Sequence, residues 1–250
     1  RSFAQSLMGI KKSKEAYVIP SVVADSSHPI GRRVQFAIGH DPQDAPTAST
    51  DGTVTRTGAA CLACQGAVPL AYVRAEGKAQ RLGETLMAVV AEGSRQRIYL
   101  PPTDRHRAAA DVSAPDDLPP GDLPDQALGF RVGGYGMTKF TDLFTHRQLV
   151  ALTTFSTLVS EARVRIAADG ASSAYADAVA TYLGLGVSRY TNFMNALCQW
   201  RPDAGKEQVG HLFTRQAIPM TWDFAEANPF SNSAGGWSPS FQFLPKAIDH

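Results

Sequence analysis

A segment rich in proline and aspartate separates two parts of the chain whose apolar residues repeat with different periods. Residues 113–126 contain Pro115, Pro119, Pro120 and Pro124 together with Asp116, Asp117, Asp122 and Asp125, a composition typical of a linker. Apolar residues tend to alternate before this segment and recur every three or four residues after it, which predicts strands followed by helices. We therefore predict an α+β fold with a β-rich, ribbon-like N-terminal half (1–112), a linker (113–135) and a helical C-terminal half (136–250).

The first part carries β-branched and aromatic residues between turn signals. Strands are expected at 16–23 and 33–38, joined by a turn over 25–31, and further strands at 68–73, 86–91 and 97–100. Residues 40–52 are expected to form an exposed loop. Thr103 is placed to cap a short helix that runs through Ala110.

The second part begins with the residues of a capping box, Thr145 and Gln148, which predict the start of a long helix. A second helix is expected from Ser173, continuing far enough to include Leu197 and Cys198 before Pro202 ends the helical region. The apolar stripe of the first helix consists of Leu152, Phe155, Val159, Ala162 and Ile166. Glycines inside the second helix, Gly184 and Gly186, are expected to mark a close backbone contact or a kink.

Composition excludes several classes of protein. The formal net charge of +1 gives no overall field toward nucleic acid or an anionic membrane, and no apolar run approaches the roughly 20 residues that span a bilayer. Three cysteines are too few for a disulfide scaffold, so a reducing cytoplasm is the simplest location. The chain begins at Arg1 rather than at methionine, which indicates a processed protein or a piece of a longer one.

Residues 212–230 mix charged and aromatic side chains too closely for an ordinary solvated helix face. We interpret this segment as a wall between the core and something bound. Arg215 is expected to pair with Asp223 or Glu226, because buried charges are costly without a partner. A phosphate contact by Arg215 is the alternative, and Trp222 lies in the same segment.

Three shorter motifs each allow a functional and a structural interpretation. Cys61 and Cys64 have the spacing of a zinc knuckle, but a zinc site needs four ligands and the residues alone favour two reduced thiols. Residues 130–136 resemble a nucleotide loop but lack its strand-to-helix context, so they are interpreted as a flexible start to the helical half. Asn228, Pro229 and Phe230 are similar to the base-holding loop of amino-methyltransferases, although a turn that ends a helix at Ala227 is favoured.

Four ordered blocks together resemble one family. Residues 75–93, 142–155, 178–183 and 215–230 are similar to the large bacterial adenine-specific DNA methyltransferases that contain a zinc ribbon. The similarity extends from about residue 11 to residue 236. This chain departs from the family pattern at Gln65, where a knuckle usually has glycine, and at Thr214, where glycine usually precedes Arg-Gln.

The resemblance implies a role for the chain as the middle of such an enzyme, an insert region of a Rossmann-like methyltransferase. The loop that binds S-adenosylmethionine would precede Arg1, and the catalytic Asp-Pro-Pro-Tyr loop would follow His250. Cys61 and Cys64 would then be the second half of a zinc ribbon whose other cysteine pair lies upstream. DNA would be the partner of the full-length enzyme, in a restriction–modification or phage-defence setting, and the isolated chain would be inactive.

Two alternative hypotheses remain open. The chain could be a non-catalytic helical scaffold derived from such an enzyme, in which case its two long helices should expose an apolar face. Alternatively, Asn228, Pro229 and Phe230 could form a degenerate catalytic loop.

Overall fold

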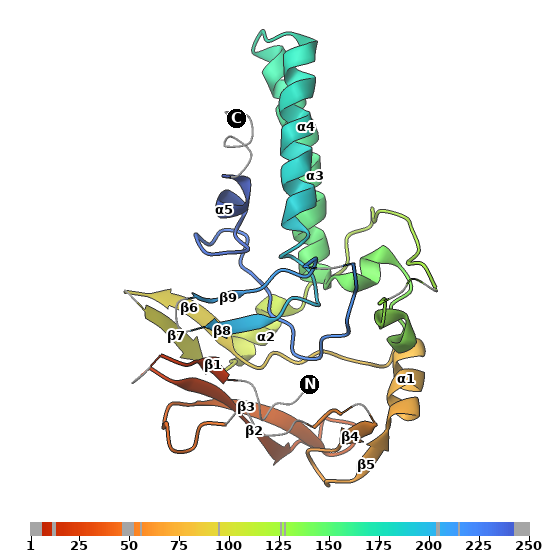
Figure 1. Ribbon diagram of the computed structural model, residues 1–250, viewed down its shortest axis with the longest axis vertical. Coiled ribbons are helices and arrows are strands. Elements are labelled where there is room, and N and C mark those ends of the chain that lie inside the picture. The colour runs from red at the N-terminus through yellow and green to blue at the C-terminus, as the bar shows by residue number, and fades with distance from the viewer. Residues whose placement is uncertain are drawn as a thin grey trace.

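The computed structural model describes residues 7–11, 14–46, 53–55, 57–94, 96–125, 127, 129–203, 206–214 and 216–242. Within these residues the chain is a mixed α/β protein with small antiparallel sheets and five α-helices (Figure 1). The strands are β1 (Leu7–Gly9), β2 (Ala16–Ala24), β3 (Arg32–Gly39), β4 (Gly58–Ala60), β5 (Ala67–Pro69), β6 (Val89–Gly93), β7 (Gln96–Leu100), β8 (Trp200–Asp203) and β9 (Lys206–Val209). The helices are α1 (Leu70–Lys78), α2 (Asp104–Ala110), α3 (His146–Ala168), α4 (Ser173–Tyr190) and α5 (Trp237–Phe241), with 3₁₀-helices η2 (Val132–Tyr135) and η3 (Phe140–Leu143).

The long antiparallel hairpin of β2 and β3 confirms the first two predicted strands. Its register pairs Val18 with Ile38 and Pro20 with Phe36. Among the residues that the structure describes, strand β1 pairs only with Ala16 and Tyr17, so β2 has no described neighbour on that side at Pro20, where a missing N–H group is tolerated. The apolar face of this sheet forms a core with Met8 and Tyr99.

The strand predicted at 68–73 is wrong. Strand β5 ends at Pro69, which has extended backbone angles, and α1 begins at Leu70. The run Leu70, Tyr72 and Val73 fits a short helix as well as a strand, and residues 74–76 are good helix formers. The predicted strand at 86–91 is shifted to β6, whereas that at 97–100 is confirmed as β7.

Helix α1 packs backbone to backbone against η2, the segment that was expected to be a flexible start to the helical half. Val132 in η2 is buried, and the side chain of Gln80 donates to the carbonyl of Gly136 at 2.9 Å. A Cβ atom at Gly136 would collide with the carbonyl of Gly77, and one at Gly77 would collide with the carbonyl of Tyr135. Gly136 is therefore required by the close contact between this segment and α1.

Substitution of Gly136 tests this contact. Gly136 and Gly170 both have left-handed backbone angles, φ 90° and 96°, but a Cβ at Gly170 would meet open space. Gly170→Ala should lower the free energy of unfolding by about 1 kcal/mol through backbone strain alone. Gly136→Ala should cost about 3 kcal/mol, because overpacking is added. Urea unfolding measures both, and equal losses would contradict a tight α1–η2 contact.

Helices α3 and α4 form an antiparallel hairpin that projects from the rest of the molecule (Figure 1). The predicted capping box is confirmed, since Thr145 Oγ1 accepts from the N–H of Gln148 and Gln148 Oε1 accepts from the N–H of Thr145. The predicted stripe of α3 coincides with its less exposed positions. At the base of the hairpin, Trp237 of α5 stacks on Phe155 with ring centroids 4.2 Å apart, and both rings meet Tyr190 edge to face.

Helix α4 ends at Tyr190, earlier than predicted. Leu197 and Cys198 lie in the turns that follow, where the Asn195 side chain donates to the carbonyl of Thr191 and accepts from the N–H of Leu197. Asparagine competes with helical backbone hydrogen bonds in this way. A Cβ at Gly184 would meet open space, so this glycine does not mark a close contact.

The central core is assembled from segments that are far apart in the sequence. It includes Leu123 from the proline- and aspartate-rich segment, so that segment contributes a buried anchor to the core. The described residues of 113–125 form no helix or strand, and the division into domains at this segment stays a prediction. None of the helices in the described ranges is long and apolar enough to cross a bilayer. The buried residues of this core are Leu123, Val132, Leu143, Leu197, Leu212 and Ile218.

Candidate functional site

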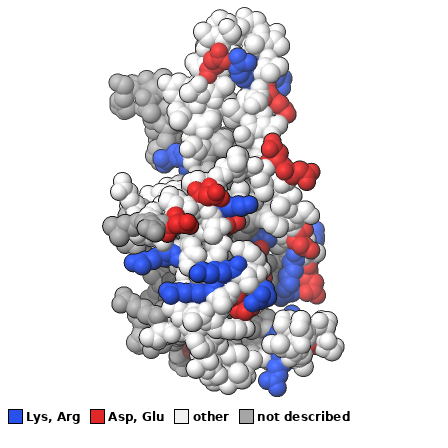
Figure 2. Space-filling view, turned by 90° about the vertical axis from the view of Figure 1, so that its right-hand side faces the viewer, with Lys and Arg blue, Asp and Glu red and all other residues white. Residues whose placement is uncertain are grey.

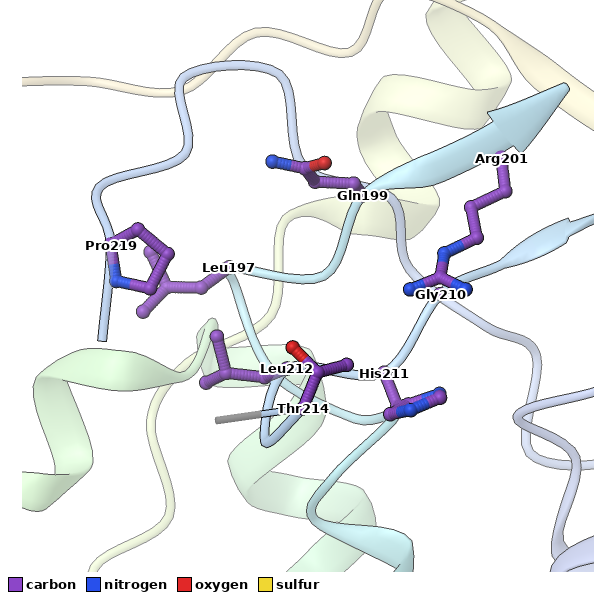
Figure 3. Close-up of a pocket in the computed structure, with 8 residues that line it drawn as sticks. All are labelled: Leu197, Gln199, Arg201, Gly210, His211, Leu212, Thr214 and Pro219. Atoms are coloured by element: carbon purple, nitrogen blue, oxygen red, sulfur yellow. The ribbon is translucent and has the colours of Figure 1, made fainter. Parts of the chain in front are cut away.

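Part of the 212–230 segment lies between the central core and a surface cavity. Leu212 and Ile218 belong to the core, and Leu212, Thr214 and Pro219 line the cavity (Figure 3). The segment thus has one apolar side packed inside the protein and another side facing open space. This arrangement fits the wall predicted from its composition, and the nature of any bound group stays a prediction.

The cavity has a volume of about 210 Å³ and is built from two neighbouring stretches of chain. Gln199 and Arg201 come from β8 and the residue before it, and the opposite side follows directly after β9 (Figure 3). The two sides are joined by a hydrogen bond of 2.7 Å from the N–H of Gly210 to the carbonyl of Gln199. The lining residues are Leu197, Gln199, Arg201, Gly210, His211, Leu212, Thr214 and Pro219.

Arg201 is the charged residue of this lining. Its side chain lies against Gly210, where an added Cβ would come within 2.5 Å of Arg201 Nε. Among the residues that the structure describes, no carboxylate forms an ion pair with Arg201. The cavity therefore has a net positive charge on its described walls.

Cys61 and Cys64 lie in the tight turn that connects β4 and β5. The turn is closed by hydrogen bonds from the N–H of Cys61 to Gly66 and from the N–H of Gln65 to Cys61. Gln65 has φ 59°, the left-handed conformation for which the family pattern places glycine. Gln65 therefore adopts the turn conformation that glycine would have, but with backbone strain.

The turn is shaped to stabilise a thiolate at Cys61. Hydrogen bonds from the backbone N–H groups of Cys64 and then Ala63 lower the pKa of the Cys61 thiol, because they favour its charged form. The same N–H groups would support a metal-bound thiolate. Within the described ranges no group of three or more His, Cys, Asp or Glu side chains gathers, so Cys61 and Cys64 would supply half of a four-ligand zinc site.

Alkylation by iodoacetamide tests the electrostatics of this turn. Because the thiolate is the reacting form, Cys61 should react with a rate–pH inflection below the ordinary thiol value of about 8.5. Cys198 is buried, and burial raises its pKa to about 12, so it should stay unmodified until the protein unfolds. Peptide mapping by mass spectrometry follows both sites. An inflection for Cys61 at or above that of the urea-unfolded chain would contradict the assignment.

The predicted pairing of Arg215 with Asp223 or Glu226 stays a prediction, because Arg215 lies outside the described residues. Glu226 pairs with Arg147, which donates from Nε and Nη2 to the two carboxylate oxygens at 3.1 and 2.7 Å. Asp223 is half-buried, and Trp222 packs edge to face on Tyr135 with centroids 5.2 Å apart.

Arg147 joins three separate segments. Besides Glu226, it donates to Glu84 at 2.9 Å and to the carbonyl of Ala110 at 2.6 Å. The hydrogen bond with Glu226 is the main reason that the pKa of Arg147 is raised. Bidentate arginine–carboxylate pairs are strong when partly shielded from water, and the side chain of Arg147 is only 26% exposed.

Replacing Arg147 tests the importance of this junction. Arg147→Met should lower the free energy of unfolding by about 1.5–3 kcal/mol, because it leaves Glu226 and the Ala110 carbonyl without their donor. Arg163→Met is the matched control, since its ion pair with Asp177 is about half exposed on both sides and should change stability by less than about 1 kcal/mol. Thermal or urea unfolding measures the stability of both variants. Equal losses of stability would contradict the importance of the Arg147 junction.

Asn228, Pro229 and Phe230 form a turn at the surface. Asn228 Oδ1 accepts from the N–H of Phe230 at 2.9 Å, and its carbonyl accepts from Ser231. This is an Asx turn, and Phe230 is 87% exposed. The residues before it are not helical, so the predicted helix ending at Ala227 is wrong, while the turn itself is present. A catalytic role for these three residues stays a prediction.

Sequence reasoning did not identify Arg147 or Arg201. Arg147 follows the capping residue Thr145 and looked like a solvated helix residue, because its partners are 37 to 79 positions away. Arg201 precedes Pro202, which was interpreted only as a helix breaker. No local sequence signal distinguishes Arg201 from an ordinary surface arginine, because Asp203 and Glu207 follow it closely in the chain.

Comparison of the chain with protein-family models, with curated proteins and with solved structures gives no match.

Proposed function

We propose that this chain is the central, target-recognition region of a DNA adenine N6-methyltransferase that uses S-adenosylmethionine. The observation that carries the proposal is the tight β4–β5 turn, which holds Cys61 and Cys64 in one hydrogen-bonded turn, as half of a zinc ribbon would require. The four sequence blocks described above support the same family. The insertion of this region into a Rossmann-like enzyme is part of the proposal.

In this proposal the chain holds DNA while flanking segments supply the chemistry. The family resemblance places the loop that binds S-adenosylmethionine before Arg1, so the methyl donor would bind mainly to residues outside this chain. The role of this region would be to position or distort the duplex so that an adenine can leave the stack.

The charge distribution is compatible with DNA as the partner. Although the formal net charge is only +1, Figure 2 shows Lys and Arg side chains gathered across the middle of the face on which α1 lies. Exposed cations also lie on α1, at Arg74 and Lys78, and at the starts of η2 and η3, at Arg131 and Lys139. A local basic surface contacts phosphates without a large net charge on the whole chain.

Zinc would organise the β4–β5 turn when two further ligands are supplied. Cys61 and Cys64 would bind as thiolates, and two ligands from a flanking segment would complete a tetrahedral site. The metal would have a structural role, joining this region to the rest of the enzyme.

A second candidate function is supported by the surface of the α3–α4 hairpin. Several large apolar residues there are between 41% and 64% exposed, as expected for a scaffold that packs against a partner protein. They are Leu158, Val164, Tyr175, Tyr182 and Leu185.

The test uses the longer coding region that contains this chain. The full-length protein is expected to bind zinc and to form N6-methyladenine in DNA, measured by elemental analysis and nucleoside mass spectrometry. The double variant Cys61→Ser/Cys64→Ser should lose the zinc, whereas Cys198→Ser should keep it. Purified residues 1–250 should show no methyl transfer.

Two outcomes would contradict the methyltransferase proposal. One is methyl transfer by residues 1–250 alone, and the other is a full-length protein that neither binds DNA nor methylates it. A stable oligomer in sedimentation experiments, dispersed by Leu185→Glu and without DNA affinity, would instead support the scaffold.

A further inference from the structure

We propose that the cavity beside β8 is a phosphate-binding site with Arg201 as its main ligand. This inference rests on the proposed function, and it assigns the phosphate to the backbone of DNA. The site is separate from the Cys61–Cys64 turn and from the Asn228–Phe230 turn, and it borders the 212–230 segment.

The charge of the cavity favours an anion. Arg201 lines it, and none of the eight lining residues is acidic. Among the described residues Arg201 has no ion-pair partner, so its guanidinium remains available to an incoming ligand. Arginine presents a planar fork of N–H donors that matches two phosphate oxygens.

The other polar groups also suit a phosphate. The Gln199 amide, the Thr214 hydroxyl and the His211 imidazole each offer a hydrogen-bond donor at the cavity (Figure 3). Side chains of these kinds commonly contact phosphate oxygens in protein–DNA complexes. Leu197, Leu212 and Pro219 form apolar walls beside these donors.

The size of the cavity favours a phosphate group over larger ligands. Its volume of about 210 Å³ equals that of about seven water molecules in the liquid. This space accommodates a phosphate group with part of its ester. A backbone phosphate also fits the exposed positions of the polar side chains, because the strand can pass over the opening while one group enters.

The backbone holds these groups in place before any ligand arrives. The N–H of Leu212 donates to Asn192 at 2.9 Å, and that of Phe213 donates to the Asn192 side chain at 2.7 Å. His211 packs against Phe193 with ring centroids 5.6 Å apart. Preorganised groups lose less conformational freedom on binding. A site of this kind can therefore bind a single phosphate group.

The DNA arm of the test measures the salt dependence of binding. Fluorescence anisotropy with a labelled duplex, between about 50 and 200 mM salt, gives the slope of log K against log salt. Arg201→Gln should reduce this slope by about one and weaken binding equally for different sequences. Arg165→Gln is the matched control, because Arg165 is an exposed arginine near the far end of α3, and it should leave the slope unchanged.

A second variant moves Arg201 without changing any charge. Gly210→Ala would place a methyl group against Arg201 Nε, so the guanidinium must leave its position. We expect Gly210→Ala to reduce the slope in the same direction as Arg201→Gln. Circular dichroism confirms that both variants are folded, and a folded Arg201→Gln with the wild-type slope would overturn the DNA assignment.

The phosphate arm needs no DNA. Titration with inorganic phosphate, followed by NMR, should shift the Arg201 Nε–H and Thr214 amide signals in a saturable way in the wild type but not shift the Thr214 signal in Arg201→Gln. No shift in the wild type would overturn the phosphate site. A shift combined with an unchanged DNA slope would keep the site and assign it to a free phosphate compound. Wild-type protein that binds phosphate but no DNA would instead count against the proposed function.

Discussion

The guanidinium of Arg147 joins parts of the chain that are far apart in the sequence. From the first turn of α3 it makes four hydrogen bonds, to Glu226, Glu84 and the carbonyl of Ala110. The long helical hairpin is thereby fixed to the segment after α1, to the end of α2 and to the 212–230 wall. Because the side chain is largely shielded from water, each of these bonds contributes more than a fully exposed pair would.

Two further contacts connect the sheets to this centre. The Met8 carbonyl accepts from both Tyr99 Oη and Trp200 Nε1, at 3.2 and 2.7 Å, which ties the N-terminal sheet to β7 and to β8. Helix α1 reaches the same centre through the glycine contact with η2. Since β8 carries Arg201, the position of the cavity depends on the packing of the N-terminal sheet as well as on the 212–230 segment.

The candidate sites divide the proposed work in a physically consistent way. The Cys61–Cys64 turn stabilises a thiolate, and the proposed zinc site there would need two further ligands from a partner segment. The cavity beside β8 offers a cation and neutral donors but no carboxylate among its described lining residues. Both features suit a region that holds and positions a nucleic acid, with the methyl donor and the catalytic loop supplied from elsewhere.

The sequence alone determined those elements whose interactions are local. The capping box at Thr145, the cap at Thr103 and the β2–β3 hairpin are set largely by local patterns, and each is present where it was predicted. Tertiary structure decided the rest. Helix α1 replaced a predicted strand because residues 70–73 fit both structures and packing on η2 favours the helix, and Glu226 pairs with Arg147, 79 positions away. These outcomes depend on contacts between residues more than 50 positions apart, and a local pattern carries no information about which distant groups the fold will bring together.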